Sequence, residues 1–345
     1  MDIFSKYMNL DDIARIAGVS RTTVSRVIND HPDVSAPTRE KVRKIIEEHR
    51  FHPNPVARML VTKQTRIIGV GFHNPTYLFP SYYASTLYLG INRVAYERNY
   101  ATLMWWEQSH MEKDYFTRRI LQQRRLMDGI LIATADVSAL LIEQLMESKI
   151  PFVMIEKPTR YTDEINYVTI DNIQSAYIAV EHLIKLGRKR IAHITGSLNI
   201  IDGQERLVGY RNALQRHDIP FDPDLVAEGA FTRESGYCAM KELLERDIPI
   251  DAVFVGNDDC AEGVFQSLKE ANICIPDDIA VVGFDDVPAA QDFTPRLTTI
   301  HQSIQERGAR GTALLLDLIE GRVKKPHHII LPSHLVIRQS CGAQV

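Results

Sequence analysis

The chain has 345 residues, of which 45% are hydrophobic and 24% charged, and its formal net charge is −4. This length predicts two or three domains. The sequence has no apolar run near the roughly 20 residues that cross a bilayer, no signal-peptide pattern in MDIFSKYMNL and no CxxC spacing among its four cysteines. These features argue against a membrane protein, a disulfide framework and a zinc site, and they predict a protein of the reducing cytoplasm.

The charge is distributed unevenly along the chain. Residues 1–66 hold twelve Lys/Arg and eight Asp/Glu, a net charge of +4, whereas the remainder holds 28 and 36, a net charge of −8. A basic head on an acidic body predicts that only the head meets a polyanion such as nucleic acid.

The stretch 9–29 predicts two short helices joined by a tight turn. Asn9 is a good N-cap, Asp12 places a carboxylate in the first turn, and Gly18 can end the first helix in a left-handed conformation. Ser20 is expected to cap the second helix. The expected buried residues are Ile13, Ala14, Ile16, Ala17, Val24, Val27 and Ile28.

The outer side of the second helix carries donors and short hydroxyls and no carboxylate. Two short helices around a glycine turn are typical of the helix-turn-helix motif, whose second helix enters the DNA major groove. An ordinary amphipathic helical hairpin is the alternative that this spacing leaves open. The candidate DNA-contacting residues are Arg21, Thr22, Ser25, Arg26 and Asn29.

A third helix is predicted for APTREKVRKIIEEHRF, with Ser35 as its cap and Pro37 in its first turn. Its apolar residues are expected to close a three-helix core over residues 1–52. Its basic residues are candidates for phosphate contacts or for simple solvated charge. The apolar and basic residues are Val42, Ile45, Ile46, Arg39, Lys41, Arg43 and Lys44.

The string AGVSRTTVSRVIN resembles the helix-turn-helix of the lactose-repressor/galactose-repressor (LacI/GalR) family of bacterial transcription regulators. The segment 53–65 also resembles that family's hinge, Pro-Asn-x-x-Ala-x-x-Leu, at Pro53, Asn54, Ala57 and Leu60. The resemblance implies that paired hinge helices enter the minor groove and that Leu60 wedges between base pairs. It therefore adds Asn54, Ala57 and Leu60 to the DNA-binding residues. The alternative for Leu60 is packing against the core.

From residue 66 onward, short β-rich runs alternate with helix-length amphipathic segments. This alternation predicts an α/β fold of doubly wound parallel sheets, and about eight strands suggest two sheets. The break between them is expected in the polar loop 157–166. The predicted strands are RIIGVGF, TLMWW, GILIA, PFVMI, YVTI, RIAHIT, AVFVGN and IAVVGF.

The strings HLIKLGRKRIAHITG, ERLVGYRNAL, AVFVGNDDCAEGV, IPDDIAVVGFDD and PRLTTIHQ resemble the same family's effector domain. The resemblance implies a periplasmic-binding-protein-like core over residues 66–345. Subdomain 1 is expected over about 66–163 and 293–325, and subdomain 2 over about 164–292 and 326–340. The helix 303–320 should join subdomain 1, and HHIILPSHLVIR should complete subdomain 2.

Ligands of open α/β sheets lie beyond the carboxyl ends of the strands, where aromatic, amide, carboxylate and arginine side chains occur in this chain. The resemblance assigns Arg206, Asn257 and Asp285 as polar effector ligands, Phe231 as a stacking residue and Gln302 as a hinge-crossing residue. The full candidate set is His73, Tyr77, Phe79, Tyr83, Arg206, Phe231, Asn257, Asp285 and Gln302. Alternatives remain for Arg206, as a structural partner of Asp202 or Glu205, and for Trp105 and Trp106, as core residues.

An enzyme is the less favoured interpretation. Adjacent acids such as Asp258–Asp259 and Asp285–Asp286 point apart at a strand end, and the sequence has no P-loop, GxSxG or HExxH motif. We expect no catalytic residue, metal or cofactor. The prediction is a ligand-controlled transcription regulator, a repressor acting as a homodimer on a near-palindromic operator. A sugar or sugar derivative is the first choice of effector, and a purine or other small metabolite is the second.

Overall fold

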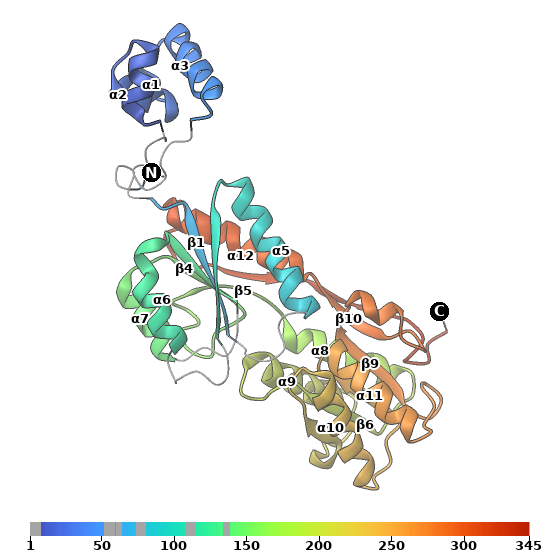
Figure 1. Cartoon of the computed structure of the whole chain (residues 1–345). Coiled ribbons are helices and arrows are strands. Elements are labelled where there is room, and N and C mark those ends of the chain that lie inside the picture. The colour runs from blue at the N-terminus through green and yellow to red at the C-terminus, as the bar shows by residue number, and fades with distance from the viewer. Residues whose placement is uncertain are drawn as a thin grey trace. The chain divides into compact units, whose positions relative to one another are not determined.

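A computed structural model describes residues 8–51, 64–73, 81–107, 115–133 and 139–344, together with Met59. Within these ranges the side chains of residues 73, 106, 107, 115 and 116 are not described. The chain divides into two compact units, residues 1–65 and 66–345, which are described separately below (Figure 1). Within the described part of the chain, no helix is long and apolar enough to cross a membrane.

The N-terminal unit contains α1 (Leu10–Ala17), α2 (Arg21–Ile28) and α3 (Ala36–Glu48). Asn9 and Asp12 form a reciprocal capping box, Gly18 adopts φ 64°, and the Ser20 side chain accepts a hydrogen bond from the Thr23 backbone amide, as predicted. Caps of this kind each stabilise a helix by about 1 kcal/mol. The buried core residues are Ile13, Ala14, Ala17, Val24, Val27, Val42, Ile45 and Phe51.

Ile16 was wrongly expected in this core, because its side chain is 45% exposed. Ile13 and Ala17 occupy the inward side of α1, and Ile16 lies one residue, or 100° of helix rotation, away from Ala17. Ser35 stands at the N-cap of α3 but makes no capping hydrogen bond to the backbone.

Two basic residues of α3 hold the loop that follows α2. The Arg39 and Arg43 guanidiniums lie 3.1 and 2.6 Å from the Asp30 carboxylate, and Arg39 also donates to the His31 carbonyl. Asp30 has φ 54°, so the loop reverses there in a left-handed conformation. The sequence predicted phosphate contacts or solvated charge for these arginines, and it did not predict this ion pair within the unit.

The core contains two six-stranded sheets. The first has the order β11-β5-β4-β3-β1-β2, and all its pairings are parallel. Its strands are β1 (Ile67–His73), β2 (Ala101–Glu107), β3 (Gly129–Ile132), β4 (Phe152–Ile155), β5 (Asn166–Ile170) and β11 (His328–Leu331). One face is covered by α5 (Tyr82–Glu97) and α12 (Ile304–Ile319), and the other by α6 (Tyr115–Gln123) and α7 (Ala139–Ser148) (Figure 1).

The second sheet has the order β12-β10-β9-β8-β6-β7, in which only β12 runs antiparallel to its neighbour. Its strands are β6 (Ile191–Thr195), β7 (Val226–Glu228), β8 (Ala252–Val255), β9 (Ala280–Asp285), β10 (Thr298–Gln302) and β12 (Ser333–Val336). Its helices are the packed pairs α8 (Asn172–Lys185) with α9 (Ile201–Arg216), and α10 (Arg233–Glu245) with α11 (Asp258–Glu270).

Three short 3₁₀ turns complete the described elements: η1 (Arg124–Leu126), η2 (Pro223–Leu225) and η3 (Pro288–Gln291). Strands β7 and β10 were not among the predicted strands. β7 has only three residues at a sheet edge, and β10 (TTIHQ) lacks the apolar run on which the other predictions relied.

The chain passes between the two sheets three times: after β5, between β10 and α12, and at Pro332 between β11 and β12. Lobe 1 is therefore 66–170 plus 304–331, and lobe 2 is 171–302 plus 333–344. The break expected in 157–166 is wrong, because β5 pairs with β4 on one side and β11 on the other. The segment HHIILPSHLVIR, expected to form one last strand of subdomain 2, instead forms two strands. β11 lies at the edge of the lobe 1 sheet, and β12 lies at the edge of the lobe 2 sheet. The placement of helix 303–320 in lobe 1 agrees with α12.

One apolar cluster extends through both lobes. It contains β1 and α5 residues such as Val70 and Leu87 together with α8 and β9 residues such as Val180 and Phe284. The opposite faces of the sheets have their own separate clusters. Since both sheets are largely parallel, each presents the carboxyl ends of its strands at one edge, and the polar candidates follow those ends.

Candidate nucleic-acid interface and ligand cleft

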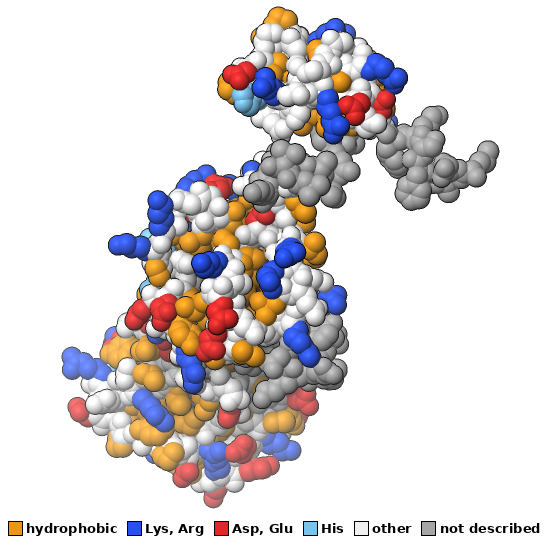
Figure 2. Space-filling view, turned by 90° about the vertical axis from the view of Figure 1, so that its left-hand side faces the viewer, with side chains coloured by type: hydrophobic (Ala, Val, Ile, Leu, Met, Phe, Trp, Pro, Cys, Tyr) orange, Lys and Arg blue, Asp and Glu red, His pale blue; other side chains and the backbone are white. Residues whose placement is uncertain are grey.

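The outer side of α2 presents the predicted DNA-contacting residues. Arg21, Thr22, Arg26 and Asn29 are exposed and Ser25 is half-buried, while Val24 and Val27 anchor the helix from below. Arg21 lies 3.3 Å from Asp11, but both side chains are 64% exposed, so this ion pair costs little to break. On the visible face of this unit, Lys and Arg side chains are more prominent than acidic ones (Figure 2).

Several predicted residues lie outside the described residues. These are Asn54, Ala57 and Leu60 in the expected hinge and Tyr77 and Phe79 in the expected cleft wall. The backbone of His73 ends β1, but its side chain is not described.

Arg206 on α9 lies at the centre of the cleft and is 3% exposed. Its Nε donates to Asn172 at 3.0 Å and its Nη1 donates to the Gly256 carbonyl at 2.5 Å. Its Nη2 lies 3.8 Å from Asp202. The structural pairing with Asp202 is therefore present, whereas Glu205 pairs elsewhere. Fixed in this way, the guanidinium is preorganised rather than mobile.

Aromatic rings flank this guanidinium. The Arg206 Cζ lies 3.7 Å from the Phe284 ring centroid and 5.4 Å from that of Phe231. Gly196 leaves room for the Phe231 ring, because a Cβ there would come within 1.8 Å of the ring. Phe231 itself has φ 59°. Phe284 is fully buried in the apolar cluster and supports the guanidinium, so the half-buried Phe231 is the ring that can cover the apolar face of a ring-shaped ligand.

Asn257 and Asp258 stabilise the start of α11. The Asn257 side chain accepts from the Cys260 amide at 3.0 Å and donates to the Phe231 carbonyl at 3.2 Å. Asp258 accepts from Thr299 at 2.6 Å and from the Val287 amide at 3.0 Å. Burial raises the pKa of Asp258. The Asn257 amide is therefore already used in capping α11 and in holding Phe231.

A buried polar chain links the remaining candidates. The Tyr83 hydroxyl donates to Glu156 at 2.5 Å, Arg307 donates to both Glu156 and Gln302, and Gln302 donates to Asp285. Burial raises the pKa of Glu156 to about 8 and that of Asp285 to about 7, while nearby guanidiniums oppose both shifts. Tyr83, Gln302 and Asp285 are thus brought together as predicted.

Sequence reasoning missed Glu156 and Arg307. Arg307 is fully buried on α12, where it occupies the apolar side of the helix with Ile304, Leu314 and Leu315. A cation at an apolar position of an amphipathic helix was the available signal. Glu156 gave no such signal, because it follows β4 in a polar string.

The remaining acid pairs and aromatic candidates have structural roles. Asp286 lies 2.5 Å from Arg338 and 2.9 Å from His301, so it turns away from the Asp285 contacts. Trp105 is in the lobe 1 core and donates to Gln123 at 2.7 Å. Adjacent acids therefore do point apart.

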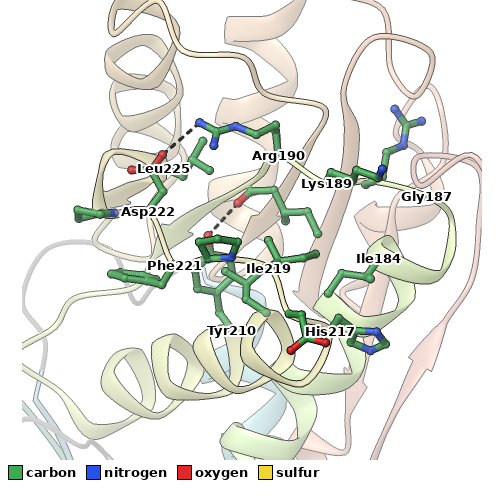
Figure 3. A pocket seen from close by; sticks show the side chains of 16 residues that line it. Ile184, Gly187, Lys189, Arg190, Tyr210, His217, Ile219, Phe221, Asp222 and Leu225 are labelled. Atoms are coloured by element: carbon green, nitrogen blue, oxygen red, sulfur yellow. Dashed lines mark hydrogen bonds and ion pairs between the residues drawn. The ribbon is translucent and has the colours of Figure 1, made fainter.

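A pocket of about 730 Å³ lies elsewhere in lobe 2 and is not this cleft. Figure 3 shows it beside Arg190, Tyr210 and Phe221, where β6 begins, at the opposite edge of the sheet from the candidate ligands. Its Arg190 pairs with Asp222, and the Tyr210 hydroxyl bonds to the Ile191 carbonyl. A smaller pocket of about 330 Å³ does include Asp285 and Gln302. Position relative to the strands, rather than volume, identifies the cleft.

A helix-turn-helix unit joined to a two-lobed core with a polar cleft defines the class of ligand-responsive DNA-binding regulators. The family profile "Bacterial regulatory proteins, lacI family" matches residues 9–54, and "Periplasmic binding protein-like domain" matches residues 180–341.

Similar proteins agree over almost the whole chain. The HTH-type transcriptional regulator CelR of Thermobifida fusca is 35% identical over 333 residues, 96% of this chain and 97% of CelR. Catabolite control protein A of Priestia megaterium is 33% identical over 330 residues, 95% of this chain and 98% of that protein. The PurR repressor of Vibrio atlanticus is 34% identical over 317 residues, 91% of this chain and 92% of PurR.

Solved structures match as well. A CelR–cellobiose complex is 33% identical with a TM-score of 0.76, covering 96% of this chain and 99% of its own. A Lac repressor dimer bound to operator and the anti-inducer ONPF is 29% identical with a TM-score of 0.85, covering 98% and 100%. The chain belongs to the lacI family, as the resemblance implied, and it is a DNA-binding transcription regulator.

Proposed function

We propose that this regulator is a repressor that binds a near-palindromic operator as a homodimer in the cytoplasm and responds to a sugar or sugar derivative in the inter-lobe cleft. The observation that carries the effector assignment is the cluster of Arg206, Asp202 and Asn172 beside the half-buried Phe231 ring. Charged and amide groups can exchange paired hydrogen bonds with vicinal hydroxyls, and aromatic faces can cover the apolar side of a sugar ring.

The dimer follows from how such a motif reads DNA. One helix-turn-helix protomer reads a half-site, so a two-fold dimer reads a near-palindrome. The structure of the similar Lac repressor holds a dimer on its operator, which supports this assembly. The residues proposed for base contact are Arg21, Thr22, Ser25, Arg26 and Asn29, and those proposed for the minor groove are Asn54, Ala57 and Leu60.

The response to effector depends on the two lobes. A ligand that contacts both lobes favours one angle between them through its differential affinity for the two states. The segment 53–65 leads directly into β1 of lobe 1, so the lobe angle can change the separation of the two hinges in a dimer. Hinges that no longer meet lose specific affinity for the operator. Whether the effector weakens or strengthens DNA binding depends on which angle it favours.

A purine is the second candidate effector, because a similar repressor is named PurR and the half-buried Phe231 ring could stack on a planar base. The two candidates make different demands on the cleft. A sugar needs many hydrogen-bond partners around its ring, whereas a base needs two parallel apolar faces. The partners of Arg206 and the Asp285–Gln302 pair favour the sugar.

A paired experiment on the full chain tests this function. Operator selection from random duplexes should return a sequence with two-fold symmetry, and thermal-shift titration with cellobiose, glucose, hypoxanthine and guanine should show stabilisation by a sugar. A saturating ligand at about 100 times its Kd should stabilise the fold by about 2.7 kcal/mol. Binding to DNA that is sequence-independent would contradict the operator assignment, and stabilisation by the purines alone would replace the sugar with the second candidate.

A further inference from the structure

An ion pair joins the two lobes beside the first chain crossing, where Asp171 also attracts the Lys157 ammonium. The Lys157 ammonium, in the loop after β4 of lobe 1, lies 2.7 Å from the Glu205 carboxylate on α9 of lobe 2. Lys157 follows Glu156 and Glu205 precedes Arg206, so both partners are chain neighbours of residues that line the cleft. The hydrogen bond that Lys157 donates to Glu205 also raises the pKa of Lys157, so the lysine stays charged.

Arg206, Gln302 and Asp285 are only 3%, 3% and 6% exposed, so the side chains around them must move before an effector can contact all three. Separation of β4 from α9 breaks the contact between Lys157 and Glu205. We propose that these two residues form a clasp that sets the balance between open and closed lobes and thereby acts on effector binding without touching the effector. This inference rests on the proposed function, in which the cleft is the effector site.

The exposure of the pair suits a reversible clasp. The Lys157 side chain is 36% exposed and that of Glu205 is 11% exposed, so water and salt compete for the lysine while the carboxylate is partly shielded. Partly exposed ion pairs are weak and are screened by salt. Such a pair can shift the equilibrium between open and closed lobes without holding the lobes permanently closed.

The clasp can be measured on the full chain without effector or operator. Spin labels at native Cys238 on α10 and at an introduced Glu147→Cys on α7 report the distance between the lobes, because both positions are exposed. Cys274→Ser removes the other exposed thiol, and the buried Cys260 and Cys341 remain. Dilution with unlabelled protein removes the distances between labels on two different chains, so the measured distance is the one within a single chain.

Reversal of one charge should open the lobes. Lys157→Glu and Glu205→Lys should each raise the ratio of open to closed molecules about two- to fivefold, as expected for a weak pair. The double exchange Lys157→Glu/Glu205→Lys should restore the original distribution. Lys185→Glu is a matched control, because Lys185 pairs with Glu181 at 2.7 Å within α8 alone, and it should leave the distance unchanged.

Salt dependence separates a clasp from a general loss of stability. Raising ionic strength from about 0.05 to 0.5 M should shift the unmodified chain toward open, whereas the mild variant Lys157→Gln should already be open and respond little. The clasp would be overturned if Lys157→Glu and Glu205→Lys both left the distance unchanged. It would also be overturned if the double exchange were more open than either single variant. Because no ligand is used, that result would leave the proposed function intact, and a failure to bind any sugar would leave the distance result standing.

Discussion

The Arg307 guanidinium donates to the Glu156 carboxylate within lobe 1 and to the side-chain oxygen of Gln302 at the end of β10. One buried cation therefore connects two lobe 1 elements to the strand that arrives from lobe 2. Gln302 in turn donates to Asp285, so the contact extends to the candidate effector ligands. This arrangement leads to the first two predictions.

At about pH 9, where Glu156 is ionised, Arg307→Met should destabilise the core by about 3–5 kcal/mol, because it leaves a buried carboxylate without its counter-charge. The double variant Arg307→Met/Glu156→Gln should recover much of that loss, since a neutral pair needs no compensation. Denaturant unfolding of the full chain at about pH 9 measures both. A double variant as unstable as the single one would show that packing, not charge, is the main contribution of Arg307.

The pH dependence of stability should carry the signature of Glu156. Its pKa in the folded protein is about 8, above the value of about 4.5 for an exposed glutamate, so the folded state binds more protons between these values. Its contribution is fully present below about pH 4.5 and is lost as the pH rises through 8, with a slope of at most about 1.4 kcal/mol per pH unit. Glu156→Gln should therefore flatten the unfolding free energy between about pH 6.5 and 8.

A separate group sets the acid side of that profile. Burial lowers the pKa of His193 to about 4, so protonation of the unfolded chain destabilises the fold as the pH falls through about 6.5. Between about pH 4.5 and 6.5 the Glu156 and His193 contributions have opposite slopes, so Glu156→Gln should make the loss of stability toward acid pH steeper. An identical profile in wild type and variant from pH 5 to 8 would refute the raised pKa of Glu156.

Arg26→Ala should weaken operator binding about 5- to 150-fold, as expected when one bidentate base contact worth about 1–3 kcal/mol is lost. Arg26 is exposed at the last turn of α2, so thermal stability should change little. Fluorescence anisotropy with the selected operator gives the affinity. Lys44→Ala on the exposed side of α3 serves as the charge-matched control, and an equal loss in both variants would indicate non-specific electrostatics.

Leu60→Ala should reduce the bend of the operator, since a smaller side chain cannot wedge between base pairs. Circular-permutation gel shifts measure the bend. Met59→Ala, at a variable position of the resembling hinge, should leave the bend unchanged. A bend that survives Leu60→Ala would favour packing of Leu60 on the core instead.

Arg206→Ala should remove the ligand response while leaving operator affinity without ligand within a few-fold. The lost charged hydrogen bonds each contribute about 1.5–3 kcal/mol, enough to weaken effector binding at least about tenfold. Isothermal titration with the sugar identified by thermal shift measures this loss. Arg211→Ala, on the same helix but stacked on Phe221 at 4.3 Å, is the control that should bind the sugar normally.

The N-terminal unit was predictable in detail because its determinants are local. Asn9, Gly18 and Ser20 act within three or four residues of themselves, and the apolar spacing of α2 selects Val24 and Val27 without reference to the rest of the chain. The alternation of strands and helices in the core was also predictable from the sequence. So was the position of the polar residues that follow strand ends, which meet at one edge of each sheet. Arg206, Asn257 and Asp285 follow from that rule together with the family resemblance.

Tertiary structure decided what depends on distant partners. β5 belongs to lobe 1 because β11, about 160 residues later, pairs beside it, and no local pattern distinguishes one parallel sheet from the next. Glu156 meets Arg307 across 151 residues and Lys157 meets Glu205 across 48. A charged residue in sequence is ordinarily solvated surface. Only the packing of α12 on lobe 1 and the approach of α9 reveal which charges are buried and which partners they join.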